Sequence, residues 1–168
     1  MNDTSLRSGA GADRAAGGAG PRHSVPLHRA EALWLLGSVS LGRIVFTRDA
    51  LPAIRPVNHL LHRGEIVLRT HEGAALASVA RQAVGEGVVV AYEADALDPV
   101  THLGWSVVVT GYCRPVTDPQ DLAHYREALH PWTDGPREHA LRIRPALVTG
   151  VRLTARSQGV RREPGDRP

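Results

Sequence analysis

The chain has 168 residues, of which 42% are hydrophobic and 22% charged, and its formal net charge is +3. No apolar run approaches the ~18 residues of a membrane-spanning helix, and the N-terminus lacks the basic-then-apolar pattern of a signal peptide, so we expect a cytoplasmic protein without membrane contacts. All 20 basic residues are arginine, which excludes a pyridoxal phosphate Schiff base and a Walker-type phosphate loop, because both require a lysine.

Composition divides the chain into one domain and two tails. Residues 1–24 are rich in glycine and alanine with scattered charges, and we expect them to be disordered. Residues 155–168 are expected to form a flexible, arginine-rich tail. Because much of the positive charge lies in this tail, the high arginine content is weak evidence for a nucleic-acid-binding surface. Residues 25–154 remain as a single domain, and its lone Cys113 agrees with a reducing compartment.

The first half of this domain is expected to be a helix followed by three strands. The helix covers residues 28–36 and ends at Gly37, and Ala32, Leu33 and Leu36, joined by Trp34, face the core. The predicted strands cover residues 42–47, 53–61 and 65–70. A tight turn at Arg63–Gly64 joins the last two as a hairpin.

The second half alternates helices with longer strands. We expect helices over residues 73–84 and 117–129, and a loop over residues 95–101. The strands are predicted over residues 87–93, 103–114 and 140–153. Six strands with short turns and helices at the corners indicate a mainly β protein, a small antiparallel Greek-key barrel. Because barrel edges need covering, self-association is expected as well.

Two of the segments suggest a binding site for a flat, phosphorylated molecule. In Arg55–His59 a proline lies inside a strand, which indicates an edge whose free backbone groups can pair with a heteroaromatic ring, although an ordinary edge strand fits equally well. At the corner from Arg69 to Ala75 a strand turns through Gly73 into a helix. The first N–H groups of such a helix attract a phosphate, to which Arg69 and Thr70 add a guanidinium and a hydroxyl.

Two further segments carry tryptophans. In the strand that begins at Gly104, Trp105, Val107 and Val109 share one face, while Ser106 lies on the other. The loop of residues 131–137 places Trp132 and Arg137 among prolines and a glycine, which suggests contact with a ligand or a partner.

In this order and spacing the segments resemble the pyridoxamine 5′-phosphate oxidase-like, FMN-binding split-barrel family, over about residues 26–153. The motifs that carry the resemblance are Arg55–Asn58, Arg69–Thr70 with Gly73, Gly104–Gly111, Pro131–Trp132 with Arg137, and Arg142–Gly150. The resemblance implies a six-stranded split barrel that forms a homodimer with FMN at the interface and acts as a flavin-dependent oxidoreductase on a small molecule. The cofactor-binding residues that it implies are Arg55, Pro56, Val57, Asn58, Arg69, Thr70, Gly73, Ser106, Trp132 and Arg137.

The chain departs from the family pattern at one position of consequence. Members often carry Ser-Lys after the glycine of the corner, where the lysine pairs with the FMN phosphate, whereas this chain has Ala74 and Ala75. Losing one charge-assisted contact costs on the order of 1.5–3 kcal/mol. Arg55, Arg69 or His71 could compensate, and Arg81 ranks last because it should point away from the start of the helix. The Arg-x-His motif of true pyridoxine phosphate oxidation is also missing near Arg142–Arg144.

Other classes of function stay open. A carrier or sensor of flavin, deazaflavin or haem would use the same barrel without turnover. A barrel that binds single-stranded nucleic acid would need aromatic platforms, and aromatic residues are only 4% here, so no nucleic-acid partner is expected. The nine histidines form no ligand pair with a nearby carboxylate, so no metal site is expected either. Spacing identifies no catalytic residue.

Overall fold

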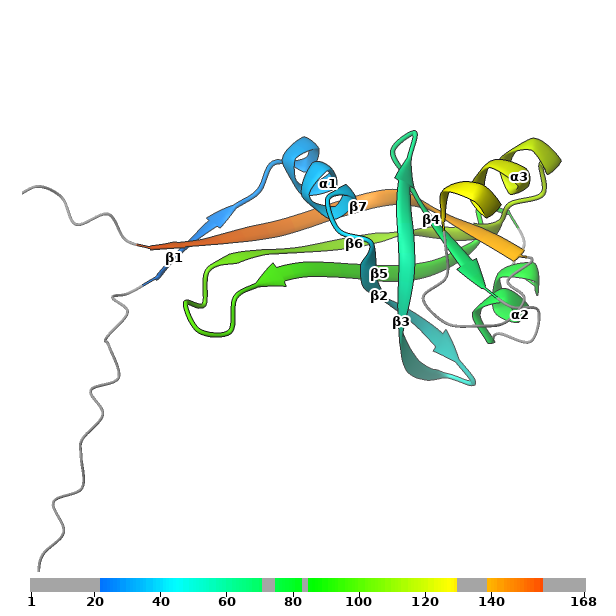
Figure 1. Ribbon diagram of the computed structural model, residues 1–168. Coiled ribbons are helices and arrows are strands. Elements are labelled where there is room, and N and C mark those ends of the chain that lie inside the picture. The colour runs from blue at the N-terminus through cyan, green and yellow to red at the C-terminus, as the bar shows by residue number, and fades with distance from the viewer. Residues whose placement is uncertain (1–21, 71–74, 83–84, 130–138, 156–168) are drawn as a thin grey trace, which may run out of the picture.

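The computed structural model describes residues 22–70, 75–82, 85–129 and 139–155 (Figure 1). The helices are α1 (Arg29–Gly37), α2 (Ala75–Gln82) and α3 (Pro119–Ala128). The strands are β1 (Arg22–Pro26), β2 (Leu41–Arg48), β3 (Leu51–His62), β4 (Glu65–Thr70), β5 (Val88–Leu97), β6 (Gly104–Pro115) and β7 (His139–Ala155). In the described part of the chain no helix is long and apolar enough to cross a membrane.

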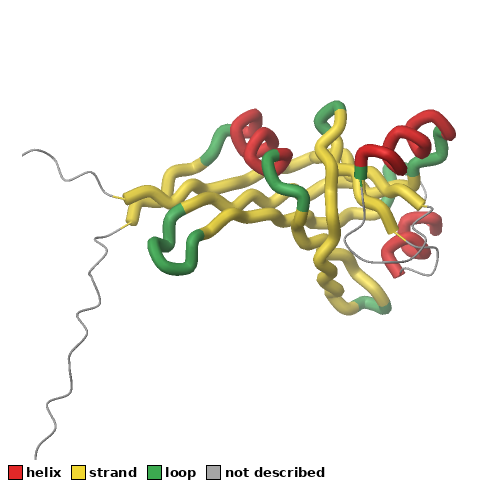
Figure 2. Tube along the Cα trace, viewed as in Figure 1, coloured by secondary structure: helices red, strands yellow, loops and turns green. Residues whose placement is uncertain are grey.

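The strands form an antiparallel sheet that closes on itself. Its order is β1-β7-β4-β3-β2-β5-β6, and β6 also pairs with β7, so β2 to β7 complete a ring of six strands. Figure 2 shows the strands in yellow with the three helices on the outside of the sheet. The predicted six-stranded antiparallel barrel is therefore confirmed, with one strand added at its edge.

That additional strand, β1, was missed by the sequence analysis. Its residues pair with the end of β7, from Pro26 opposite Val151 to Arg22 opposite Ala155. The predicted disordered tail of residues 1–24 thus overlaps a strand at residues 22–24, and Ala155 belongs to β7 rather than to the C-terminal tail. Because this strand is short and exposed and lacks alternating hydrophobic residues, its sequence does not predict a strand. Its extended conformation follows from its pairing with β7. The remainder of both tails lies outside the described residues.

Two-residue turns explain the tight hairpins. Asp49 and Ala50, between β2 and β3, have φ of 50° and 61°, and Arg63 and Gly64, between β3 and β4, have φ of 51° and 78°. Left-handed φ at both central positions matches the right-handed twist of the flanking strands. The predicted loop over residues 95–101 is too long, because β5 pairs with β6 as far as Leu97 opposite Gly104.

The barrel core contains the expected strand faces. Trp105, Val107 and Val109 of β6 are buried together with Ile44 of β2 and Tyr92 of β5. The prediction for α1 is wrong in one residue, since Ala32 and Leu36 are buried but Trp34 is 69% exposed.

A second, smaller cluster lies outside the barrel beneath α3. Tyr125 of α3 packs on Val67 of β4 and Ala140 of β7, with Leu60 of β3 at its edge. Asp118 caps α3, because its carboxylate accepts hydrogen bonds from the backbone N–H groups of the first turn. α3 therefore covers β4 and the second half of β3, close to the predicted cofactor strand.

Candidate functional site

The predicted cofactor strand has an open edge. β3 pairs with β2 through residues 51–58 but with β4 only through residues 59–62. Among the described residues, Arg55–Asn58 therefore have a partner strand on one side only, and Pro56 lies opposite Arg43 of β2. The backbone groups on the other side are available to a ligand, as the proline in this strand predicts.

Two side chains of this edge are available for ligand contact. Arg55 is exposed, and its Nη1 donates only to the carbonyl of the preceding residue, Ile54, at 2.7 Å. Asn58 is half-buried, and its amide Nδ2 is buried without a hydrogen-bond partner. A buried donor without an acceptor costs about 1–3 kcal/mol, which makes Asn58 the residue of this strand that most needs a ligand.

Arg69 and Thr70 follow Leu68, the last residue of β4 that pairs with β3, so the register brings them beside the open edge. They are adjacent in a strand and face opposite sides of the sheet. Arg69 faces α3, and its Nη1 donates to the carbonyls of Leu129 at 3.0 Å and Arg126 at 3.3 Å. The sequence analysis put both side chains at a phosphate, whereas the structure directs the Arg69 guanidinium to the end of α3.

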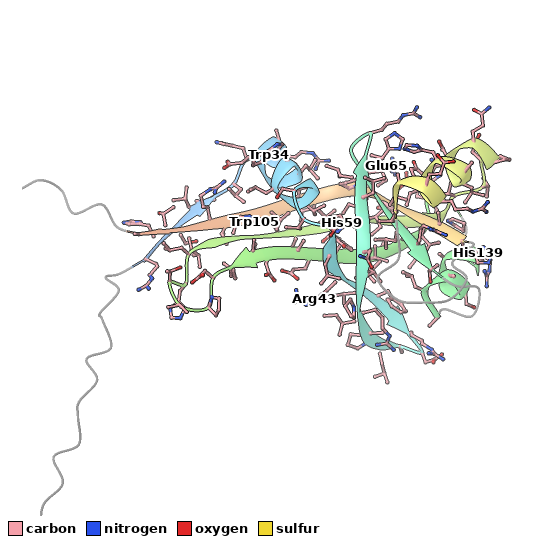
Figure 3. All side chains as sticks on the ribbon, viewed as in Figure 1. Trp34, Arg43, His59, Glu65, Trp105 and His139 are labelled. Atoms are coloured by element: carbon pink, nitrogen blue, oxygen red, sulfur yellow. The ribbon has the colours of Figure 1, made fainter. Side chains whose placement is uncertain are left out.

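His139 was not anticipated from the sequence. It lies opposite Thr70 in the pairing of β4 with β7, and its Nε2 is buried without a hydrogen-bond partner (Figure 3). It also borders a cavity of about 30 Å³ with Ala77 and Arg81 of α2. Only the strand register reveals this neighbourhood, because 68 residues lie between positions 70 and 139 in the chain.

Of the other predicted residues, the structure describes only Ser106, which is not at this edge. Ser106 of β6 is separated from β3 by β5 and β2 in the sheet. Its hydroxyl donates to Glu93 at 3.4 Å, and Arg43 binds both Glu93 and Asp95, at 3.0 and 3.1 Å. Burial raises the pKa of Glu93, an effect that Arg43 opposes. Gly73, Trp132 and Arg137 lie outside the described residues.

A buried histidine supports the cofactor strand from inside the barrel. His59 of β3 is 3% exposed, and its Nε2 donates to the Leu36 carbonyl at 2.8 Å while its Nδ1 accepts from the Tyr92 hydroxyl at 2.8 Å. The ring is the neutral tautomer in this arrangement, and burial lowers its pKa. Burial also disfavours the ionised form of Tyr92, which for a phenol raises the pKa. Gly42 makes room for the pair, since a Cβ atom there would overlap the Tyr92 hydroxyl.

A cavity of about 680 Å³ opens beside the same strand, within the ~300–1,000 Å³ typical of small-molecule sites. It begins at Asn58 and follows β3 to Leu61. Its wall is completed by the segment from the last residue of α1 to the first residue of β2 (residues 37–41), by Arg43 and Asp95, and by the end of α3. The described residues contain no group of three or more histidine, cysteine, aspartate or glutamate side chains that could hold a metal ion.

Comparison with known proteins identifies the family. Residues 28–152 match the family model of pyridoxamine 5′-phosphate oxidase. The chain belongs to this family. A curated relative, the uncharacterized protein Rv0080 of Mycobacterium tuberculosis, is 50% identical over 137 residues, which cover 82% of this chain and 90% of that protein.

Two solved structures extend the comparison. A putative pyridoxamine 5′-phosphate oxidase from Corynebacterium glutamicum is 32% identical with a TM-score of 0.62, covering 76% of this chain and 91% of that chain. The FAD binding protein from Mycobacterium smegmatis is 35% identical with a TM-score of 0.61, covering 77% of this chain and 98% of that chain. The fold of this chain is thus the antiparallel split barrel of the family, as the resemblance implies.

Proposed function

We propose that this protein binds FMN along the open edge of β3 and acts as a flavin-dependent oxidoreductase on a small molecule. The observation that carries the proposal is the edge itself, where Arg55–Asn58 lack a second partner strand and the buried Asn58 amide lacks an acceptor. The likeness to an FAD binding protein at 35% identity supports a flavin as the occupant.

The residues at the edge fit a flavin in chemical terms. The imide side of an isoalloxazine ring alternates carbonyl acceptors with an N–H donor, as a strand backbone does, and Asn58 supplies a further donor. Arg55 is the exposed guanidinium of this strand and is suited to a phosphate. Thr70 at the end of β4 and His139 opposite it on β7 are polar groups near the start of α2, where Ala75 stands in place of the lysine that the family resemblance implies.

The bound flavin would supply hydride or electron transfer. The chain itself holds the ring in place and keeps water from one side of it. Behind the strand, the hydrogen bonds of His59 to Tyr92 and to the Leu36 carbonyl hold β3 against the core. Because both ring nitrogens of His59 are engaged, we assign it a positioning role rather than proton transfer.

We propose further that the protein is a homodimer with its flavin sites at the interface. The outward faces of β5, β6 and β7 expose apolar side chains, and Val89, Val108, Leu147 and Val151 are 60%, 37%, 59% and 39% exposed. Such a patch on a barrel favours association. Ser106 lies on this face, remote from its own β3, so that a two-fold partner would bring it to the flavin.

The test is the absorption spectrum of the purified protein, followed by titration of the apo protein with FMN at fixed ionic strength. We expect saturable FMN binding in the micromolar range. FAD, a deazaflavin and haem are titrated for comparison, and tighter binding of any of these would replace FMN as the proposed cofactor. Arg55→Gln should weaken FMN binding about tenfold. Its matched control, Arg48→Gln, changes an exposed arginine of the same hairpin and should leave affinity unchanged.

Turnover separates the enzyme from a carrier. A loaded enzyme should oxidise a reduced nicotinamide in the presence of an acceptor. Flavin binding without turnover across a panel of acceptors would instead favour the non-catalytic carrier or sensor.

A further inference from the structure

We propose that the cavity beside β3 is the substrate site and that its ligand is an uncharged ring compound with carbonyl oxygens, of the quinone type, rather than a phosphate ester. The inference rests on the proposed flavin site, because the cavity begins at Asn58, where the open edge of β3 ends, and continues along Leu60 and Leu61. A molecule in the cavity would therefore lie against one end of the flavin.

The charges around the cavity disfavour an anion. Arg43 is the cation of its described wall, and two carboxylates, Glu93 at 3.0 Å and Asp95 at 3.1 Å, bind that guanidinium (Figure 3). Asp95 is the carboxylate of the described wall, and Glu93 binds the same guanidinium from outside that wall, so Arg43 is already paired on both counts. A phosphate monoester carries about −1.5 to −2 charges at neutral pH and would meet no unpaired cation in this described wall, although the family is named for an enzyme of such a substrate.

Most polar groups of the wall are already satisfied within the protein. The Ser38 hydroxyl donates to the Leu35 carbonyl at 2.6 Å, and both ring nitrogens of His59 are engaged. Two uncharged side-chain donors remain for a ligand in the described wall, namely the Ser40 hydroxyl and the Asn58 amide, which carries two hydrogens.

Leucines form much of the rest of this wall. The leucines that line it are Leu41, Leu60, Leu61 and Leu129. Apolar walls with two neutral donors suit an apolar ring that carries carbonyl acceptors.

Equilibrium dialysis of the full-length protein tests the charge preference. The probes are 1,4-naphthoquinone, its 2-sulfonate, which adds one negative charge to the same ring, and pyridoxamine 5′-phosphate. The neutral quinone should bind at least about fivefold more tightly than the sulfonate, the effect of one unit charge near a carboxylate in a wet site. Equal or tighter binding of either anion would overturn the proposal. Alkylation of Cys113 by the quinone is not expected, because the thiol is buried and burial raises its pKa to about 12.

A pair of leucine variants locates the site. Leu41 lines the cavity and is 40% exposed, whereas Leu51 lies at the far end of the same hairpin and is 69% exposed. Leu41→Arg adds a cation to the wall and should reverse the preference in favour of the sulfonate. Leu51→Arg adds the same charge elsewhere and should change nothing. If both variants behave alike, or if the neutral quinone does not bind, the cavity is not the substrate site.

The dissociation constant for FMN, measured on the same samples, separates the two proposals. Flavin binding without quinone binding refutes the cavity assignment alone. Quinone binding that responds to Leu41→Arg in a protein that binds no flavin refutes the cofactor and leaves the cavity as a ligand site.

Discussion

Replacing Gly42 with alanine is expected to lower the free energy of unfolding by about 3 kcal/mol. Gly42 is buried in β2, and a Cβ atom there would overlap the Tyr92 hydroxyl and lie 2.5 Å from the carbonyl oxygen of Glu93. Overpacking in a close-packed core costs about 1–3 kcal/mol. Displacing Tyr92 also leaves the buried Nδ1 of His59 without its donor, which costs about 1–3 kcal/mol more.

Urea denaturation of the apo protein measures this loss. In a Tyr92→Phe background the hydroxyl is absent, so neither its overlap nor the loss of the His59 donor adds to the cost of Gly42→Ala, while the ring carbon Cζ and the Glu93 carbonyl oxygen still lie 2.6 and 2.5 Å from the Cβ position. Gly42→Ala should therefore cost at least about 1 kcal/mol less there, a coupling expected for residues in contact. Gly37→Ala is the matched control. Its Cβ would lie 3.2 Å from the movable Leu61 side chain, and it should cost less than about 1 kcal/mol. A Gly42→Ala cost below about 0.5 kcal/mol, or one that is the same in both backgrounds, would refute the reasoning.

Further substitutions test the neighbouring groups. Burial lowers the pKa of His59 in the folded protein, so as pH falls below about 6.5 the histidine is protonated first in the unfolded chain. The free energy of unfolding therefore decreases in this pH range, and His59→Gln should flatten this part of a stability-against-pH curve. Asn58→Leu should stabilise the apo protein by up to about 1 kcal/mol in urea while weakening FMN binding about tenfold; a loss of stability would show that the amide has a structural partner. Arg69→Leu should cost about 1–2 kcal/mol even without FMN, since it removes the donor to the Leu129 carbonyl, and an unchanged urea midpoint would contradict that role. Cys113 should resist a thiol reagent at pH 8 until urea unfolds the chain; modification of the native protein would contradict its burial.

Local chemistry predicted the elements that depend on neighbours in the chain. β4 has the bounds expected from residues 65–70, because three consecutive apolar residues, Ile66 to Leu68, follow a turn whose glycine accepts a left-handed φ. The helix expected over residues 117–129 also begins through a local contact, since the Asp118 carboxylate caps backbone N–H groups two and three residues further along. The proline at position 56 likewise marked an open strand edge, which follows from its missing N–H group.

What depends on contacts between distant segments was decided by the tertiary structure. β1 exists because β7 extends far enough to pair with it, and the end of α3 attracts the guanidinium of Arg69. His139 comes to Thr70 only through the register of β4 on β7, while two intervening strands separate Ser106 from β3. The physical reason is that turns and caps depend on a few adjacent residues, whereas register and packing depend on which distant surfaces meet. Sequence thus indicated the open-edged strand at which we propose a flavin, and the fold determined which side chains surround it.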